Sequence, residues 1–108
     1  MKIYNIKGDM PTVQLAKDRL DMIIKYEKEK CIKVIHGYGS TGQGGQIKEM
    51  VHQWANQKMN AGIIKAYIPG EAFGHLLGFD YTIKTYMQLL KADPEGLRSN
   101  EGITYLIL

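Results

Sequence analysis

One continuous stretch, residues 32–48, constrains the fold of this chain more than any other. It begins with the apolar, largely β-branched run 32–35, passes through His36, and then becomes rich in glycine. The glycines are Gly37, Gly39, Gly42, Gly44 and Gly45. Apolar residues then return at the i, i+3, i+4, i+7 spacing of a helix face, at Ile47, Met50, Val51 and Trp54. The stretch therefore predicts a buried strand, a glycine-rich loop and a helix.

The glycine-rich loop is typical of an anion-binding site. Because glycine lacks a Cβ, successive backbone N–H groups can turn toward one ligand oxygen. The following helix adds its unpaired first-turn N–H groups and the positive end of its dipole. We therefore expect the loop to bind phosphate or carboxylate. The residues predicted to do so are Gly37, Tyr38, Gly39, Ser40, Gly42, Gly44 and Gly45.

Length and composition indicate a single domain, 1–108, with a modest basic excess. The 108 residues suffice for one hydrophobic core, and the formal charge of +3 permits a polyanionic partner without requiring one. Cys31 is the single cysteine, which excludes an internal disulfide and is consistent with a reducing compartment; we expect it to be buried. The sequence shows neither a membrane span nor a signal-peptide core, so we predict a cytoplasmic protein that does not bind membranes.

The N-terminal third predicts a strand and an amphipathic helix. Residues 2–6 alternate polar and apolar before a turn, and Thr12 can cap the helix that follows. The charged run 25–30 is expected to be a solvated helix end. The predicted core face of the helix consists of Val13, Ala16, Leu20, Ile23 and Ile24, widened by Leu15 and Met22.

The next two elements are a strand at 31–35 and a helix from about residue 46 to 59. Two strands joined by a helix are usually parallel, with a right-handed crossover. Their C-terminal ends then lie at the same edge of the sheet, so we expect Lys7 and His36 to be neighbours.

Two further strands, at 63–68 and 102–108, complete the predicted sheet. Between them we expect an irregular loop at 71–78 and a helix at 81–91 capped by Asp80. The predicted fold is an α/β two-layer sandwich with a four-stranded mixed sheet. Along the chain, the elements follow the order βαβα-β-(α)-β.

Two nucleotide-binding motifs can be compared with the loop. Residues 37–42 satisfy G-x-G-x-x-G, but no carboxylate follows at the end of the next strand, where a ribose-binding acid is expected. A Walker-type loop is excluded because Gly44-Gly45-Gln46 stands where Gly-Lys-Ser/Thr is required. Both comparisons argue against a nucleotide-binding domain.

The segment 34–42 has the pattern V-I-H-G-Y-G-x-x-G and leads into a helix. It resembles the His-Gly-x-Gly motif of the Smr family, the small MutS-related domains. Residues 4–8 and 12–16 are similar to the family's first strand, Leu-Asp-Leu-His-Gly, and to its Thr-Val-x-x-Ala helix start. Residues 102–108 resemble its last strand.

Five departures from the family pattern accompany this resemblance. Lys7 replaces the family histidine and Asn5 its aspartate, Lys48 stands where arginine is frequent, and the glycine loop is about four residues longer. Residues 69–101 form an enlarged connection between the last two strands. The resemblance implies binding of DNA or RNA, with nicking endonuclease activity in some members, and a divalent metal if cleavage occurs.

Side-chain chemistry gives these residues definite candidate roles. Lys7 and Lys48 are cations suited to phosphate oxygens. The reference pKa of histidine, about 6.5, would let His36 act as acid, base or phosphate donor, and the alternative is a structural hydrogen-bonding role. Tyr38 could stack on an unpaired base or pack over the loop. No His, Asp or Glu set has a recognisable metal-ligand spacing.

Two other functions compete with nucleic-acid binding. The same loop, with His36 as acid–base catalyst, would serve an enzyme acting on a small phosphorylated or carboxylated ligand. Alternatively, the Met- and Tyr-rich connection between the last two strands would make the chain a protein-interaction module. The sequence does not indicate the number of subunits.

Overall fold

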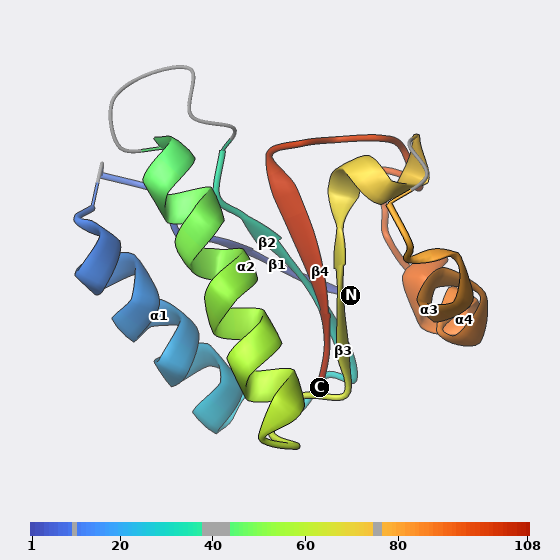
Figure 1. The fold of residues 1–108 in the computed structure, drawn as a ribbon, viewed down its shortest axis with the longest axis horizontal. Coiled ribbons are helices and arrows are strands. Elements are labelled where there is room, and N and C mark those ends of the chain that lie inside the picture. The colour runs from blue at the N-terminus through green and yellow to red at the C-terminus, as the bar shows by residue number, and fades with distance from the viewer. Residues whose placement is uncertain (10, 38–43, 75–76) are drawn as a thin grey trace.

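A computed structural model describes residues 1–9, 11–37, 44–74 and 77–108. Its elements are β1 (Lys2–Asn5), α1 (Val13–Tyr26), β2 (Cys31–Ile35), α2 (Gly44–Asn60), β3 (Ala66–Pro69), the 3-10 helix η1 (Gly70–Phe73), α3 (Asp80–Thr85), α4 (Met87–Leu90) and β4 (Ile103–Ile107). The strands form one sheet in the order β1-β2-β4-β3 (Figure 1). β1 and β2 are parallel, whereas β4 is antiparallel to both β2 and β3. The predicted four-stranded mixed sheet is therefore confirmed.

The start of α1 follows from its sequence. The Thr12 hydroxyl accepts a hydrogen bond from the N–H of Leu15 at 3.1 Å, which satisfies one of the unpaired donors of the first turn. The helix ends after Tyr26, where the backbone becomes extended at Glu27. The crossover from β1 through α1 to β2 gives the parallel pair that the sequence predicts.

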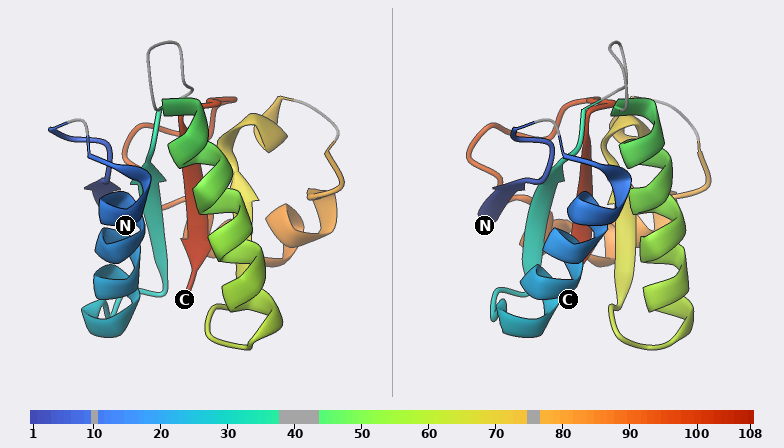
Figure 2. Two further views of the ribbon diagram at one scale, coloured as in Figure 1. Left: turned by 60° about the vertical axis from the view of Figure 1, so that its left-hand side comes forward. Right: turned by 90° about the vertical axis from the view of Figure 1, so that its left-hand side faces the viewer.

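Helices α1 and α2 cover one face of the sheet (Figures 1 and 2). Trp54 of α2 is buried there, and its indole N–H donates to Asp21 of α1 at 2.8 Å, which joins the two helices. The buried residues of this core are Ile6, Ala16, Leu20, Ile32, Val34, Ile47, Met50, Val51, Trp54, Ala55, Ile64 and Leu106.

The connection between β3 and β4 packs on the opposite face of the sheet (Figure 1). The predicted two-layer arrangement therefore accounts for the sheet and for the helices on one face only. On the other face, η1, α3 and α4 partly cover the sheet. The single helix predicted at 81–91 is two short helices, because the backbone at Tyr86 leaves the helical region. The buried residues of this second core are Cys31, Ala66, Ile68, Ala72, Leu90, Ile103, Tyr105 and Ile107.

The third strand begins later than the sequence predicts. Ile63 is exposed, and β3 runs from Ala66 to Pro69 instead of from 63 to 68. Proline is tolerated more readily here than in a central strand, because β3 lies at the edge of the sheet.

The predicted core face of α1 is too wide. Ala16 and Leu20 are buried, but Leu15 and Met22 are exposed. The charged run after the helix is also not wholly solvated, because the Glu27 side chain is buried against Tyr4 and Lys2. Both differences arise at the edge of the sheet formed by β1. In the described residues, no helix is long and apolar enough to cross a bilayer.

Candidate phosphate-binding edge

The ends of β1 and β2 bring Lys7 and Gly37 together. The N–H of Ile6 donates to the carbonyl of Ile35 at 3.0 Å, which continues the parallel pairing past the last residue of β1. A Cβ at Gly37 would lie 3.2 Å from Cδ of Lys7, and Gly37 has φ +77°. Lys7 is exposed, so its ammonium group stands in solvent beside the start of the glycine-rich loop. The sequence predicts Lys7 beside His36, and the structure places it beside Gly37, the next residue.

The amide of Gly37 is not available to an anion. It donates to the carbonyl of Gly102 at 3.0 Å, and the amide of His36 donates to the same carbonyl at 2.9 Å. The sequence predicts that Gly37 contributes an anion-binding N–H, and this prediction is wrong. Glycine is favoured here by the positive φ.

The other glycine-loop predictions fall into two groups. Tyr38, Gly39, Ser40 and Gly42 lie outside the described residues. Gly44 and Gly45 form the first two positions of α2, so the helix begins about two residues earlier than the sequence predicts. Their N–H groups belong to the first turn of a helix, where intrahelical acceptors are lacking.

His36 is fully buried and has both ring nitrogens engaged. Nδ1 lies 2.7 Å from the carbonyl oxygen of Gly37, which can only accept, so Nδ1 carries the proton. Nε2 lies 2.8 Å from the Thr104 hydroxyl on β4, and in the neutral ring it accepts the hydroxyl proton. The Thr104 oxygen in turn lies 3.2 Å from Nε2 of His52, which must therefore donate. The two hydrogen bonds therefore have the same direction: His52 donates to Thr104, and Thr104 donates to His36.

Burial keeps both histidines neutral at physiological pH. It lowers the pKa of His36 to about 4, with smaller lowering from His52 and Lys48, and the hydrogen bond to Gly37 opposes the shift. The pKa of His52 is lowered as well, first by burial and then by Lys48, against the attraction of Glu71. A neutral His36 with both nitrogens occupied is suited to fixing the loop and poorly suited to transferring a proton.

Lys48 already has a carboxylate partner. Its ammonium nitrogen lies 2.5 Å from Oε2 of Glu71, the second residue of η1, and both side chains are largely buried. The sequence predicts Lys48 as a phosphate ligand, whereas here its charge is balanced within the fold. Oε1 of Glu71 is buried and has no hydrogen-bond partner among the described residues. Sequence reasoning missed Glu71 because it lies in the irregular connection after β3.

A row of aromatic rings extends from His36 across this end of the sheet. The ring centroids of His36 and His52 are 5.9 Å apart at an interplanar angle of 90°, and those of His52 and Tyr67 are 6.2 Å apart. Tyr67 meets Phe79 at 5.5 Å. His36 directly follows β2, and the others come from α2, β3 and the segment before α3, so no local spacing in the sequence predicts the row.

A second polar cluster lies on the opposite face of the sheet. The Lys33 ammonium of β2 lies 3.0 Å from Asp93 and 2.7 Å from Glu95, and the Tyr105 hydroxyl donates to Asp93 at 2.5 Å. Burial alone would lower the pKa of Lys33, but its hydrogen bonds to Glu95 and Asp93 raise it. Burial and the bond to Asp93 raise the pKa of Tyr105. This cluster fastens residues 93–95 to the sheet, and the sequence analysis missed it.

In the described part of the chain, no group of three or more His, Cys, Asp or Glu residues is arranged to hold a metal ion. Compared with models of protein families, with curated proteins and with solved structures, the chain has no match. The resemblance to the Smr family therefore stays a prediction from sequence.

Proposed function

We propose that the chain binds nucleic-acid phosphate at the edge where β1 and β2 end. The observation that carries the proposal is the position of Lys7, exposed beside Gly37 at the entrance to a strand–glycine loop–helix unit. Within the described residues, Lys7 has no carboxylate within ion-pair distance. An uncompensated ammonium group at such a unit suits a phosphate oxygen.

The helix that follows strengthens this choice of ligand. α2 is 17 residues long, and its N-terminus lies at the same end of the molecule as the ends of β1 and β2 (Figure 2). The positive end of its dipole and the ammonium of Lys7 therefore act on the same region of solvent. The similarity of residues 34–42 to the Smr motif points to the same class of ligand, DNA or RNA.

We propose binding rather than nicking as the activity of this edge. His36 is the residue that the sequence predicts as catalytic, yet its Nδ1 and Nε2 are held by Gly37 and Thr104. With a pKa lowered to about 4 by burial, it is neutral at neutral pH, and its one ring proton, on Nδ1, is donated to the carbonyl of Gly37. A positioning role for His36 fits these contacts better than acid–base chemistry.

Binding is tested by fluorescence anisotropy with single- and double-stranded DNA and RNA oligonucleotides. Lys7→Glu is expected to weaken binding about tenfold and to reduce its salt dependence, because one phosphate contact is lost. Lys65→Glu is the matched control, since Lys65 is exposed and lies before β3 at the opposite end of the strands. No affinity at low salt, or equal losses in both variants, would contradict the proposal.

The same samples test the activity. Incubation of supercoiled-plasmid and oligonucleotide substrates with magnesium or manganese is expected to leave them uncut by the wild-type chain. Cutting that disappears in His36→Ala while binding persists would instead assign His36 to chemistry.

The small-ligand alternative is favoured by the partly buried pair of Lys48 and Glu71, which lies close enough to His52 to influence its pKa. A saturable thermal shift with sugar phosphates or nucleotides, without oligonucleotide binding, would favour that alternative.

A further inference from the structure

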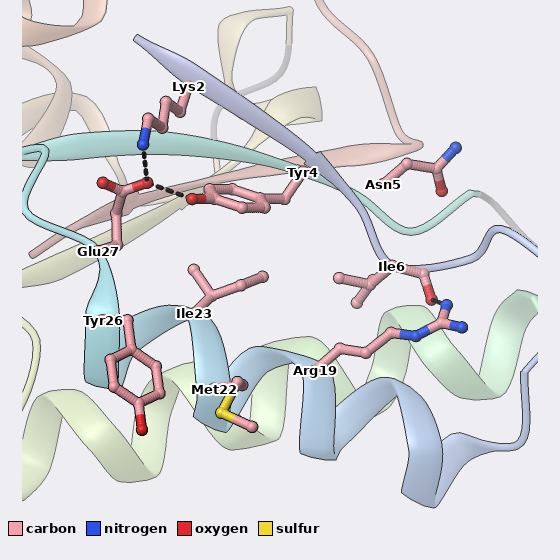
Figure 3. A pocket seen from close by; sticks show the side chains of 9 residues that line it. All are labelled: Lys2, Tyr4, Asn5, Ile6, Arg19, Met22, Ile23, Tyr26 and Glu27. Atoms are coloured by element: carbon pink, nitrogen blue, oxygen red, sulfur yellow. Dashed lines mark hydrogen bonds and ion pairs between the residues drawn. The ribbon is translucent and has the colours of Figure 1, made fainter.

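A groove of about 500 Å³ lies between the edge strand β1 and helix α1 (Figure 3). Met22, Ile23 and Tyr26 form its helical wall. Figure 3 shows that Tyr4, Glu27 and Lys2 lie together at one end and that Arg19 reaches the carbonyl of Ile6 at the other. Arg19 also donates to the carbonyl of Gly8 at 3.0 Å. The groove thus has an apolar centre between two polar ends.

The strand beside this groove has an open hydrogen-bonding edge. Within the described residues, β1 pairs with β2 alone. The N–H of Ile6 points toward β2, where it donates to Ile35. Because backbone groups alternate in direction along a strand, those of Tyr4 also face β2, whereas those of Ile3 and Asn5 face outward. An open edge of this kind can accept another strand.

Exposed apolar side chains gather around the same edge. Ile3 is 39% exposed on β1, and Leu15, Met22 and Tyr26 are 46%, 58% and 66% exposed on α1. Their spacing of i, i+7 and i+11 places the three helical residues on one face of α1. This face of α1 differs from the one that carries the buried Ala16 and Leu20. Exposed apolar side chains beside an open strand are typical of an interaction surface.

We propose that this surface pairs with a second copy of the chain, by antiparallel β1–β1 pairing across a two-fold axis at Ile3. Such a contact is isologous, so the same surface serves both copies and the assembly closes as a dimer. The two sheets become one continuous sheet, and the two α1 helices lie antiparallel on the same face. Met22 and Tyr26 of each copy then meet the apolar wall of the other copy's groove.

Charge complementarity favours a second copy over an unrelated strand. Directly opposite residues of an antiparallel pair lie on the same face, so pairing about Ile3 sets Lys2 of one copy against Tyr4 of the other. Glu27 accepts the Tyr4 hydroxyl proton in a hydrogen bond and lies 3.5 Å from Lys2 of its own copy. Its nearly buried carboxylate would thereby gain a second ammonium group, which a strand lacking this lysine does not supply.

The dimer leaves the proposed phosphate-binding edge, where β1 and β2 end, accessible in both copies. Dimerisation itself does not require that this edge bind phosphate. Because the two β1 strands run in opposite directions, the ends that carry Lys7 point away from each other. Each copy would keep its edge open to solvent.

Sedimentation equilibrium of the full chain tests the dimer. The wild type is expected to dimerise at concentrations of about 100 μM or below, and Tyr26→Lys to raise the dissociation constant at least about tenfold. Tyr81→Lys is the matched control, because Tyr81 is 81% exposed on α3, away from β1. Circular dichroism establishes that both variants remain folded.

Amide hydrogen exchange locates the contact. The amides of Ile3 and Asn5 are expected to exchange more slowly as the concentration rises, while that of Ile6, already bonded to Ile35, is protected throughout. A chain that remains monomeric at about 500 μM would overturn the inference. A dimer that Tyr81→Lys weakens equally, or one that leaves Ile3 and Asn5 unprotected, would overturn it as well.

Discussion

The Nε2 atom of His36 lies 2.8 Å from the hydroxyl oxygen of Thr104 on the neighbouring strand β4. Both side chains are fully buried. The contact fixes the position of the residue from which the glycine-rich loop departs, because the other ring nitrogen holds the carbonyl of Gly37. A buried hydroxyl between two imidazoles is therefore the main support of the proposed phosphate-binding edge.

Replacing Thr104 by valine is expected to destabilise the fold by about 1–3 kcal/mol, because the polar ring atoms of His36 and His52 lose a buried partner. Thr104→Ser keeps the hydroxyl and should cost less. Urea unfolding of the two variants measures the difference. Equal losses in both would mean that the methyl group, and not the hydroxyl, carries the effect.

The buried histidines predict a loss of stability on mild acidification. The pKa of His36 is lowered to about 4 by burial, whereas an unfolded histidine titrates near about 6.5. Between these values the unfolded chain binds more protons, so the free energy of unfolding falls as the pH falls through this window. The loss for His36 is on the order of 3 kcal/mol and levels off below about pH 4. His52 acts in the same direction.

Unfolding by urea at a series of pH values measures this dependence. His36→Gln removes the titrating group, and we expect a shallower slope between about pH 4 and 6.5, whatever its absolute stability. The lowered pKa of Asp93 produces its own loss only at more acidic pH, so the two effects separate. An unchanged slope in both His36→Gln and His52→Gln would contradict the assignment.

Local patterns in the sequence predict the first half of the fold well. The periodicity of α1, its Thr12 cap and the apolar run of β2 are set by neighbouring residues, and the parallel pairing follows from the crossover. The same reasoning assigned Leu15 and Met22 to the core. It failed there because periodicity shows that a face is apolar, but not how much of it a neighbouring element covers.

The polar contacts of the site could not be predicted in the same way. Thr104 is separated from His36 by 68 residues, and Glu71 from Lys48 by 23. The order β1-β2-β4-β3, which inserts the last strand between the second and third, is what brings Thr104 beside His36. The partners of Lys33 could not be predicted for the same reason. A lysine within an apolar strand gives no indication of its carboxylate partners, which lie 60 and 62 residues later.

The buried ion pair on the second face predicts a large effect of one carboxylate and a small effect of its neighbour. Asp93→Ala leaves the ammonium of Lys33 and the hydroxyl of Tyr105 without their buried partner, and should cost about 3–5 kcal/mol. Glu95→Ala removes a carboxylate that is largely exposed, and should cost about 1 kcal/mol or less. Thermal or urea unfolding measures the stability loss of each variant. Similar losses would show that Asp93 is not the main partner of Lys33 and Tyr105.

The junction between β3 and η1 predicts the sharpest contrast between two glycines. A Cβ at Gly70 would lie 2.1 Å from the carbonyl oxygen of Asn100 and 2.5 Å from Cγ1 of Ile103. Since Asn100 also donates its N–H to the carbonyl of Gly70 at 3.2 Å, the backbone there cannot move aside without breaking that bond. Gly70→Ala is therefore expected to destabilise the chain by about 3 kcal/mol.

A Cβ at Gly8 meets no atom within 4 Å among the described residues, so Gly8→Ala should lie within about 0.5 kcal/mol of the wild type. Urea unfolding distinguishes them, and a Gly70→Ala variant as stable as Gly8→Ala would mean that the close approach of η1 to the start of β4 is wrong.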